Sequence, residues 1–490
     1  MSGTIHLSNG IILTNPESGH LCDSITITDG RVVHHDIPLP KDAFHIDLDG
    51  RCAVPGFIDS HLHLVLAANG LGEADLRECN SIGSFQKALL QAESSLDSGQ
   101  WLVGSGWSDQ RFGEHPNKSW FPETLDIPSI CFRIDFHTAI VNSALLERLD
   151  TNRIMKMTGG HQIEDGVVME DALFDGLIPM LPKSSPETQL RRVKSAIQEL
   201  HSQGITLVGS MEHKSDIDSV LVPLQQEYSI RMRIMCLDEP TGTMLEACKA
   251  VQQDEFLQIT GFKTFLDGTL GSRSAKMYAD WSDAKGSGLW AGNASSGTLQ
   301  KWISTVSASG FAPVLHAIGD EAVGCALNQL HDVDSALIPR IEHAQCIAER
   351  DLPNLRGMWF GVQPLHQPDD AKIAEVALGV GRTHELHNWR RMIDAGAILS
   401  FGSDWPVAPP RPLEAISIAF EQGMTPQEAL VASTRNGARS LRSNLAGHLE
   451  TGAYGDLAIL THNPLNCDWN NVLPSVTMTI QEGQIVYTKD

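Results

Sequence analysis

The sequence predicts an α/β protein whose main body is a (β/α)8 barrel of the TIM type. The middle of the chain alternates short apolar runs with segments long enough for a crossover helix, and eight such runs occur. The two ends share a strand-and-turn pattern that the middle lacks, and over a hundred residues separate the first run from the second. The predicted architecture is therefore a barrel with a small β-sandwich domain built from both termini and an insertion after its first strand.

The predicted terminal domain comprises residues 1–53 and 441–490. Asp29-Gly30 stands between two β-branched runs, which is typical of a tight β-hairpin. Glu482-Gly483 occupies the same place in a similar pattern near the other end. Two ends that share a pattern and flank a middle of another type indicate one domain built from both. The strand-like runs expected in this domain are 5–7, 11–13, 25–28, 31–33, 456–460, 479–481 and 484–486.

The predicted barrel spans residues 54–440. One crossover helix is expected at 186–203, because Ser185 is a suitable N-cap, Pro186 fits the first turn and Gly204 follows the last turn. The eight apolar runs assigned to barrel strands are 54–60, 205–210, 230–237, 259–266, 312–316, 340–343, 359–363 and 398–403.

The gap between the first two barrel runs is too long for a single crossover helix. We interpret it as an inserted subdomain that covers about residues 70–165, with strand-like runs at 101–104 and 130–134. Long insertions of this kind are commonly functional. We therefore expect this subdomain to cover the mouth of the barrel and to shape the substrate pocket.

Composition limits the partners and the compartment. The 490 residues carry a formal net charge of −24, which argues against nucleic acid or an anionic membrane as a main partner. No apolar stretch approaches the ~20 residues of a membrane span, and the N-terminus lacks the features of a signal peptide. Nine cysteines without a Cys-x-x-Cys motif indicate free thiols in a reducing compartment. We expect a cytoplasmic protein that acts on a small molecule, and the sequence leaves a homodimer open.

Residues that can bind metal stand at the predicted carboxyl ends of several barrel strands, where barrel active sites lie. The first run ends in His61-Leu62-His63, and two imidazoles on one face of a strand can reach one cation. Taken singly, such a histidine can be a hydrogen-bonded core residue, a lysine can reach the surface, and an aspartate can cap a helix. Five strand ends that all present such residues are much harder to attribute to chance. The other strand-end residues are Lys263, His316, His343 and Asp404.

Five segments also carry a family resemblance. They read Pro-Gly-Phe-Ile-Asp-Ser-His-Leu-His at 55–63, Lys-Thr-Phe-Leu-Asp-Gly-Thr-Leu-Gly-Ser-Arg at 263–273, His-Ala-Ile-Gly-Asp at 316–320, Ile-Glu-His-Ala-Gln at 341–345 and Gly-Ser-Asp-Trp-Pro-Val at 402–407. With these segments the chain resembles the metal-dependent amidohydrolase superfamily. Within the superfamily it is similar to the YtcJ-like branch, which includes N-substituted formamide deformylases.

This resemblance implies a centre with two Zn²⁺ ions, with other divalent metals as the alternative. It implies that His61 and His63 hold one ion and that His316 and His343 hold the second. It also implies that Lys263 is carbamylated and bridges the ions, and that Asp404 completes the site. A lysine ammonium has no acceptor, so reaction with CO2 would turn it into the anionic ligand that such a site needs.

The implied activity is hydrolysis of a C–N bond in a small amide, such as an N-formyl or N-acyl amine, by metal-activated hydroxide. Asp404 would accept the proton of the attacking water and pass it to the leaving nitrogen. Glu342 is a candidate to orient a metal ligand, although strand alternation would point it away from the face of His343.

Substrate contacts are expected from three residues, Trp107, His137 and Arg273. Packing is the alternative for Trp107 and His137, and an internal ion pair is the favoured alternative for Arg273. Ser108 stands where the related motif usually has an acid, and Phe136 where it usually has glycine. Substrates of relatives should therefore not be transferred directly.

Two other functions remain as alternatives. The first is a mononuclear aminohydrolase or deaminase on the same barrel, against which Lys263 argues. The second is a non-catalytic regulatory barrel, against which the intact ligand set argues. His384-Glu385-Leu386-His387 is one residue short of the zincin motif, and no Gly-x-Ser-x-Gly or phosphate-binding glycine loop occurs.

Overall fold

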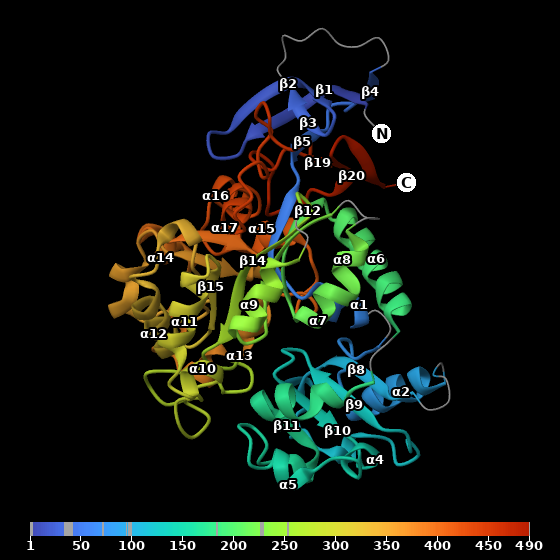
Figure 1. The fold of residues 1–490 in the computed structure, drawn as a ribbon, viewed down its shortest axis with the longest axis vertical. Helices are drawn as coiled ribbons and strands as arrows, with labels where there is room; N and C mark the ends of the chain where they lie inside the picture. The colour runs from blue at the N-terminus through green and yellow to red at the C-terminus, as the bar shows by residue number, and fades with distance from the viewer. Residues whose placement is uncertain are drawn as a thin grey trace.

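The structure, a computed structural model, describes residues 3–33, 43–70, 73–94, 96, 100–182, 185–225, 230–251 and 254–489. In the view of Figure 1 the terminal β domain lies at the top, the barrel in the middle and the inserted subdomain at the bottom. Among the helices of these ranges, none has the length and apolar character that a bilayer span requires.

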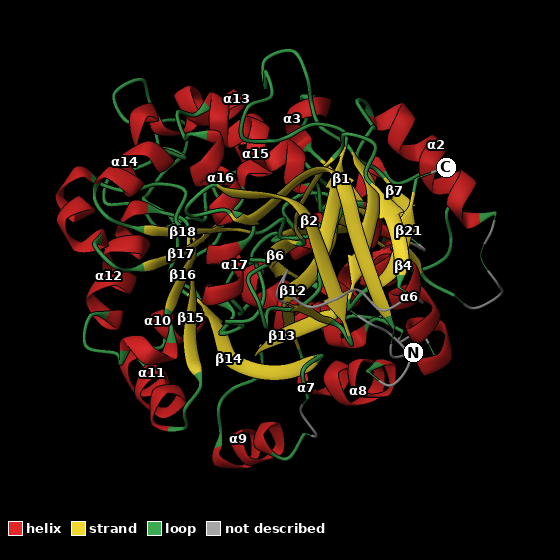
Figure 2. Cartoon of the chain, turned by 90° about the horizontal axis from the view of Figure 1, so that it is seen from above, coloured by secondary structure: helices red, strands yellow, loops and turns green. Residues whose placement is uncertain are grey.

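Eight parallel strands form the barrel, as the apolar runs predict. Each strand pairs in parallel with its neighbour from β6 through β12 to β18. Figure 2 shows helices α11 (Leu299–Ala308), α12 (Asp320–Leu330) and α14 (Trp389–Asp394) outside the strands. The strands are β6 (Phe57–Leu62), β12 (Ile205–Glu212), β13 (Arg231–Cys236), β14 (Leu257–Phe265), β15 (Ala312–Ala317), β16 (Arg340–His343), β17 (Trp359–Val362) and β18 (Ile398–Phe401).

The barrel is nearly closed, and its first and last strands are joined where they end. The backbone N–H of Asp404 donates to the carbonyl of His61 at 2.7 Å, and that of His63 donates to the carbonyl of Trp405 at 2.9 Å. This approach requires Gly402, because a Cβ there would lie 2.6 Å from the Cβ of His61. The residues that follow β6 and β18 are thereby held against each other.

Strands from both ends of the chain form one mixed sheet, which confirms the predicted composite domain. The hydrogen-bonded order is β21-β20-β19-β5-β1-β2-β3, and β4 also pairs with β1. The predicted hairpin turns at Asp29-Gly30 and Glu482-Gly483 have positive φ at both residues, as a tight hairpin requires. The strands are β1 (Thr4–Asn15), β2 (His20–Thr28), β3 (Arg31–Val33), β4 (Phe44–Asp47), β5 (Cys52–Pro55), β19 (Leu457–Leu460), β20 (Val476–Gln481) and β21 (Gln484–Thr488).

Two boundaries differ from the expectation. The runs 5–7 and 11–13 belong to one strand, β1, whose pairing with β2 shifts between Ser8 and Ile12. The first barrel run, 54–60, is divided at Gly56 between β5 in the terminal sheet and β6 in the barrel. A Cβ at Gly56 would lie 2.2 Å from the side-chain oxygen of Thr206, so the chain changes sheets where only glycine fits.

The inserted subdomain is built on its own five-stranded sheet, in the order β11-β10-β9-β8-β7. After it, α6 (Pro186–Ser202) begins as predicted, with the Ser185 side chain accepting from the backbone N–H of Thr188. The strands of the insertion are β7 (Ala74–Asp75), β8 (Leu102–Trp107), β9 (Ser129–Arg133), β10 (Thr138–Val141) and β11 (Val167–Met169).

Candidate active site

A cavity of about 820 Å³ lies between the carboxyl ends of the barrel strands and the inserted subdomain. Its volume falls in the range of small-molecule sites. Both parts of the fold contribute to its wall, so the insertion does shape the pocket. The barrel contributes His63, Lys263, His316, His343 and Asp404, and the insertion contributes Arg133 and His137.

The imidazole of His61 is fully buried at the end of β6 and is held at both nitrogens. Its Nδ1 lies 2.8 Å from Oε2 of Glu342, and its Nε2 lies 2.9 Å from Nζ of Lys263 and 3.3 Å from Oδ1 of Asp404. A carboxylate can only accept, so Nδ1 donates to Glu342, and Nε2 is the nitrogen that would turn to a metal ion. His63 directs its Nε2 to the same carboxylate oxygen, at 3.4 Å.

Glu342 is the group that fixes this orientation of His61. Its other oxygen accepts from Nε of Arg340 at 2.9 Å. Burial alone would raise the pKa of Glu342, but Arg340, His61 and Lys263 lower the pKa to about 2. Strand alternation should point Glu342 and His343 to opposite faces, yet His343 has φ 71°, which ends the regular strand. The turn of the backbone at His343 therefore lets both side chains face the site.

His343 and His316 each have one nitrogen engaged by an acceptor. The side-chain amide of Gln363 donates to the carbonyl of Gly361 at 3.1 Å and so presents Oε1 to Nδ1 of His343, at 2.9 Å. Nε2 of His316 lies 3.2 Å from the carbonyl oxygen of Gly268. The lone pairs are consequently left on Nε2 of His343 and Nδ1 of His316. Burial lowers the pKa of both rings well below the usual value, which favours the neutral form that binds metal.

Asp404 lies between these imidazoles. It adopts a positive φ of 57°, a strained conformation for a residue other than glycine. Burial would raise the pKa of its carboxyl, but His61, His63 and His343 lower the pKa well below the usual range. Asp404 is therefore an anion at neutral pH, in contact with three candidate ligands.

Lys263 projects from β14 into the same space. Burial lowers the pKa of its amine to about 8, although Asp404 and Glu342 oppose this effect. The neutral, nucleophilic fraction of the amine near physiological pH is thus far larger than at the ordinary lysine pKa of 10.5, although the protonated form still predominates.

The remaining predicted pocket residues separate into two groups. His137 lines the cavity, and its Nδ1 lies 2.9 Å from Oε2 of Glu170. Trp107 is fully buried in the core of the insertion and donates its indole N–H to the carbonyl of Cys131 at 2.7 Å. Arg273 forms a two-pronged ion pair with Asp283, at 2.6 and 2.9 Å. Trp107 and Arg273 are absent from the described cavity wall, so both positions fit the packing and ion-pair alternatives.

Two further residues of the site, Gln363 and His366, were not predicted from the sequence. Both belong to the turn after β17, where η8 (Pro364–His366) begins. His366 lines the cavity, and its ring stacks on that of His343 with centroids 6.5 Å apart. The strand-end rule could have found Gln363, which ends the seventh apolar run, whereas His366 lies beyond that run, after Pro364.

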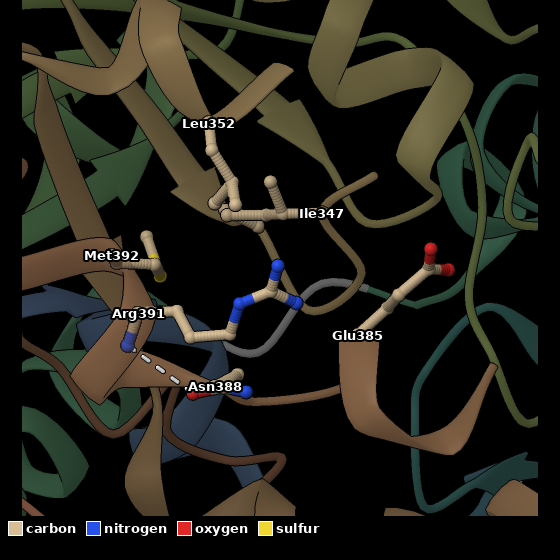
Figure 3. Close-up of a pocket in the computed structure, with 7 residues that line it drawn as sticks. Ile347, Leu352, Glu385, Asn388, Arg391 and Met392 are labelled. Carbon is tan, nitrogen blue, oxygen red and sulfur yellow. Dashed lines mark hydrogen bonds between the residues drawn. The ribbon is translucent and has the colours of Figure 1, made fainter. Parts of the chain in front are cut away.

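The described residues contain two groups whose ligand atoms lie within 4.8 Å of one another, as a metal site requires: His61, His63 and Asp404, and His343, His366 and Asp404. Neutral imidazole together with a carboxylate suits divalent transition metals. The residues therefore fit the expected metal. A separate hollow beside Arg391 and Glu385 holds only about 10 Å³ and is too small for a substrate (Figure 3).

Fold and site together define a barrel hydrolase with a candidate metal centre. A model of the amidohydrolase family matches residues 45–487. The chain therefore belongs to the amidohydrolase family, and the predicted class of enzyme, a metal-dependent hydrolase, is confirmed.

Similar proteins extend over the whole chain. Protein LONG AFTER FAR-RED 3 of Arabidopsis thaliana is 29% identical, over 98% of this chain and 91% of its own. The putative amidohydrolase YtcJ of Bacillus subtilis is 26% identical, over 98% of both chains. The solved structure of an uncharacterized metal-dependent hydrolase from Pyrococcus horikoshii superposes with a TM-score of 0.79, at 24% identity, over 96% of this chain and 99% of its own. This structural similarity supports the assignment of the fold.

Proposed function

We propose that this enzyme hydrolyses the C–N bond of a small amide, an N-formyl or N-acyl amine, at a centre of two divalent ions, most simply Zn²⁺. One observation carries the proposal. Each of the buried imidazoles of His61, His316 and His343 has one nitrogen engaged by an acceptor, which leaves the other nitrogen as a lone-pair donor. Such outer partners are typical of metal-binding histidines.

In this proposal His61 and His63 would hold one ion, and His316 and His343 would hold the other. Divalent ions held there would supply Lewis-acid chemistry, lowering the pKa of water and polarising the scissile carbonyl. Lys263 would add CO2 to its neutral amine, releasing one proton and forming a carbamate. The product replaces a buried cation by an anion with two donor oxygens, which a pair of cations requires.

Asp404 would move the proton. Its carboxylate accepts the proton of the attacking water and delivers it to the leaving nitrogen, so that an amine departs and a carboxylic acid remains. Its contacts with His61, His63 and His343 hold it at the centre of the site.

The substrate class rests on similarity and on the cavity. The N-substituted formamide deformylase of Arthrobacter pascens is 23% identical over 87% of this chain and 86% of its own. N-substituted formamides are therefore the first compounds to assay. Ser108 and Phe136 depart from the related motifs in the part of the fold that faces the cavity, so N-acyl amines with other acyl groups belong in the same panel.

The test combines metal content, the state of Lys263 and turnover. We expect two Zn²⁺ per chain after growth with zinc, a carbamate signal from protein equilibrated with ¹³CO2, and hydrolysis of at least one N-formyl or N-acyl amine. Lys263→Ala should lose metal and most activity, and short carboxylic acids should restore part of both. A fully active, fully loaded Lys263→Ala enzyme would refute the role of Lys263. A single ion with turnover of an aminoheterocycle would favour the mononuclear deaminase instead.

A further inference from the structure

We infer that His366 accepts a hydrogen bond from the N–H of the scissile amide, beside the carboxylate of Asp404. It would thereby select amides with a free N–H. This inference rests on the proposed function and deepens it, because it names which C–N bonds the site takes.

The position of His366 is fixed by the turn that follows β17. Pro364 opens η8 directly after Gln363, whose side chain holds Nδ1 of His343. One short turn thus supplies both the group that orients His343 and a further imidazole. The rings of His366 and His343 are nearly parallel, at 14°.

The ring of His366 has an unused nitrogen. Its Nε2 is buried, and no residue in the described part of the chain hydrogen-bonds to it. A buried nitrogen without a partner is destabilising, and His366 lines the substrate cavity. A ligand in that cavity is therefore the natural partner.

The short distance between His366 and Asp404 indicates that His366 contacts the leaving nitrogen of the substrate. Ligand atoms of His366, His343 and Asp404 lie within 4.8 Å of one another. Two groups that hydrogen-bond to one tetrahedral atom at ~2.8 Å are about 4.6 Å apart. A separation of at most 4.8 Å between a ring nitrogen of His366 and a carboxylate oxygen of Asp404 allows the two groups to share one substrate atom. Because Asp404 delivers its proton to the leaving nitrogen, that nitrogen is the shared atom, and its own hydrogen is directed to His366.

The test uses matched pairs of substrates, each an N–H amide and the ester of the same acyl group and similar size. His366→Phe keeps a flat ring against His343 but has no acceptor. We expect it to lower kcat/KM for the amide about 10- to 100-fold, as loss of a buried hydrogen bond implies, and to change kcat/KM for the ester less than about threefold on the same scale. His366→Asn, which retains an acceptor, should recover part of the amide activity.

His213 provides the control. It follows the carboxyl end of β12 as His366 follows β17, but it pairs with Asp238 and is absent from the described cavity wall. His213→Phe should leave both substrates unaffected.

With an active wild-type enzyme, three results would overturn the inference alone. Equal losses for amide and ester would show a general structural role, and an unchanged amide rate would show that His366 makes no contact. Loss of one metal ion in His366→Phe, measured by metal analysis, would make His366 a ligand instead. A wild-type enzyme that is inactive on the whole panel would refute the proposed function, and the inference with it, whereas an active wild type confines the failure to His366.

Discussion

Replacing Glu342 by glutamine should weaken zinc binding although Glu342 is not itself expected to touch the metal. The carboxylate fixes His61 through Nδ1 at 2.8 Å and is in turn held by Arg340 at 2.9 Å. The lowering of its pKa from 4.5 to about 2 corresponds to about 3 kcal/mol in favour of the ionised form. Loss of an outer partner of this kind typically costs about 10- to 100-fold in metal affinity.

The same substitution should destabilise the barrel, because it leaves the guanidinium of Arg340 without its carboxylate. Removing one partner of a buried pair typically costs about 3–5 kcal/mol, and the amide oxygen of glutamine should keep the loss near the lower end. Zinc affinity would be measured by competition with a chromogenic chelator, and stability by thermal unfolding. Glu170→Gln is the control, because Glu170 holds His137, which lines the same cavity, in a similar carboxylate–histidine pair. A folded Glu342→Gln protein with wild-type zinc affinity would refute this account of His61.

Three further outcomes follow from the structure. Asp404→Asn should retain at least one ion and lose at least ~100-fold in kcat; near wild-type turnover in the metal-saturated variant would remove Asp404 as the proton carrier. A strong chelator should abolish turnover and lower Tm, since bound ions stabilise the native state, and added Zn²⁺ should restore both; a chelated enzyme with full activity would contradict a metal mechanism. Burial lowers the pKa of His201 to about 4, so the folded state resists protonation that the unfolded chain accepts near 6.5. Stability should therefore fall as pH drops from 6.5 towards 4, and His201→Gln should flatten this part of the Tm–pH curve; parallel curves would contradict it.

The barrel could be predicted because its strands are buried on both faces. Parallel strands under helices read as continuous apolar runs, and all eight runs mark strands of the structure. The division of the first run between two sheets at Gly56 could not be predicted from its apolar character. The run 54–60 is uniformly β-prone, and the chain leaves one sheet for the other because Thr206 stands close to Gly56. That contact joins residues 150 positions apart, and no local pattern records it.

The candidate ligands could be predicted for a similar reason, since the carboxyl ends of barrel strands converge. The side chains that orient these ligands through hydrogen bonds could not be predicted. Glu342 and His61 lie 281 residues apart, and regular alternation would have turned Glu342 away from His343. The positive φ of His343 breaks that alternation. His366 was not predicted, because it lies beyond the strand, after Pro364, where the two-residue alternation of a strand no longer predicts the direction of a side chain.

The two buried carboxylates of the site differ in their counter-charges, and this difference assigns their roles. Glu342 is paired with the guanidinium of Arg340 at 2.9 Å, and a guanidinium is a permanent cation in proteins. Its charge is compensated permanently, so it serves as a fixed acceptor for His61. Among the described residues, the ion-pair partners of Asp404 within 4 Å are all imidazoles: those of His61, His63 and His343. Imidazoles change their charge or their partners when metal binds, and the proton affinity of Asp404 changes with them. Two like groups in unlike surroundings can thus divide positioning and proton transfer, and only the carboxylate without a permanent cation is suited to carry a proton through the reaction.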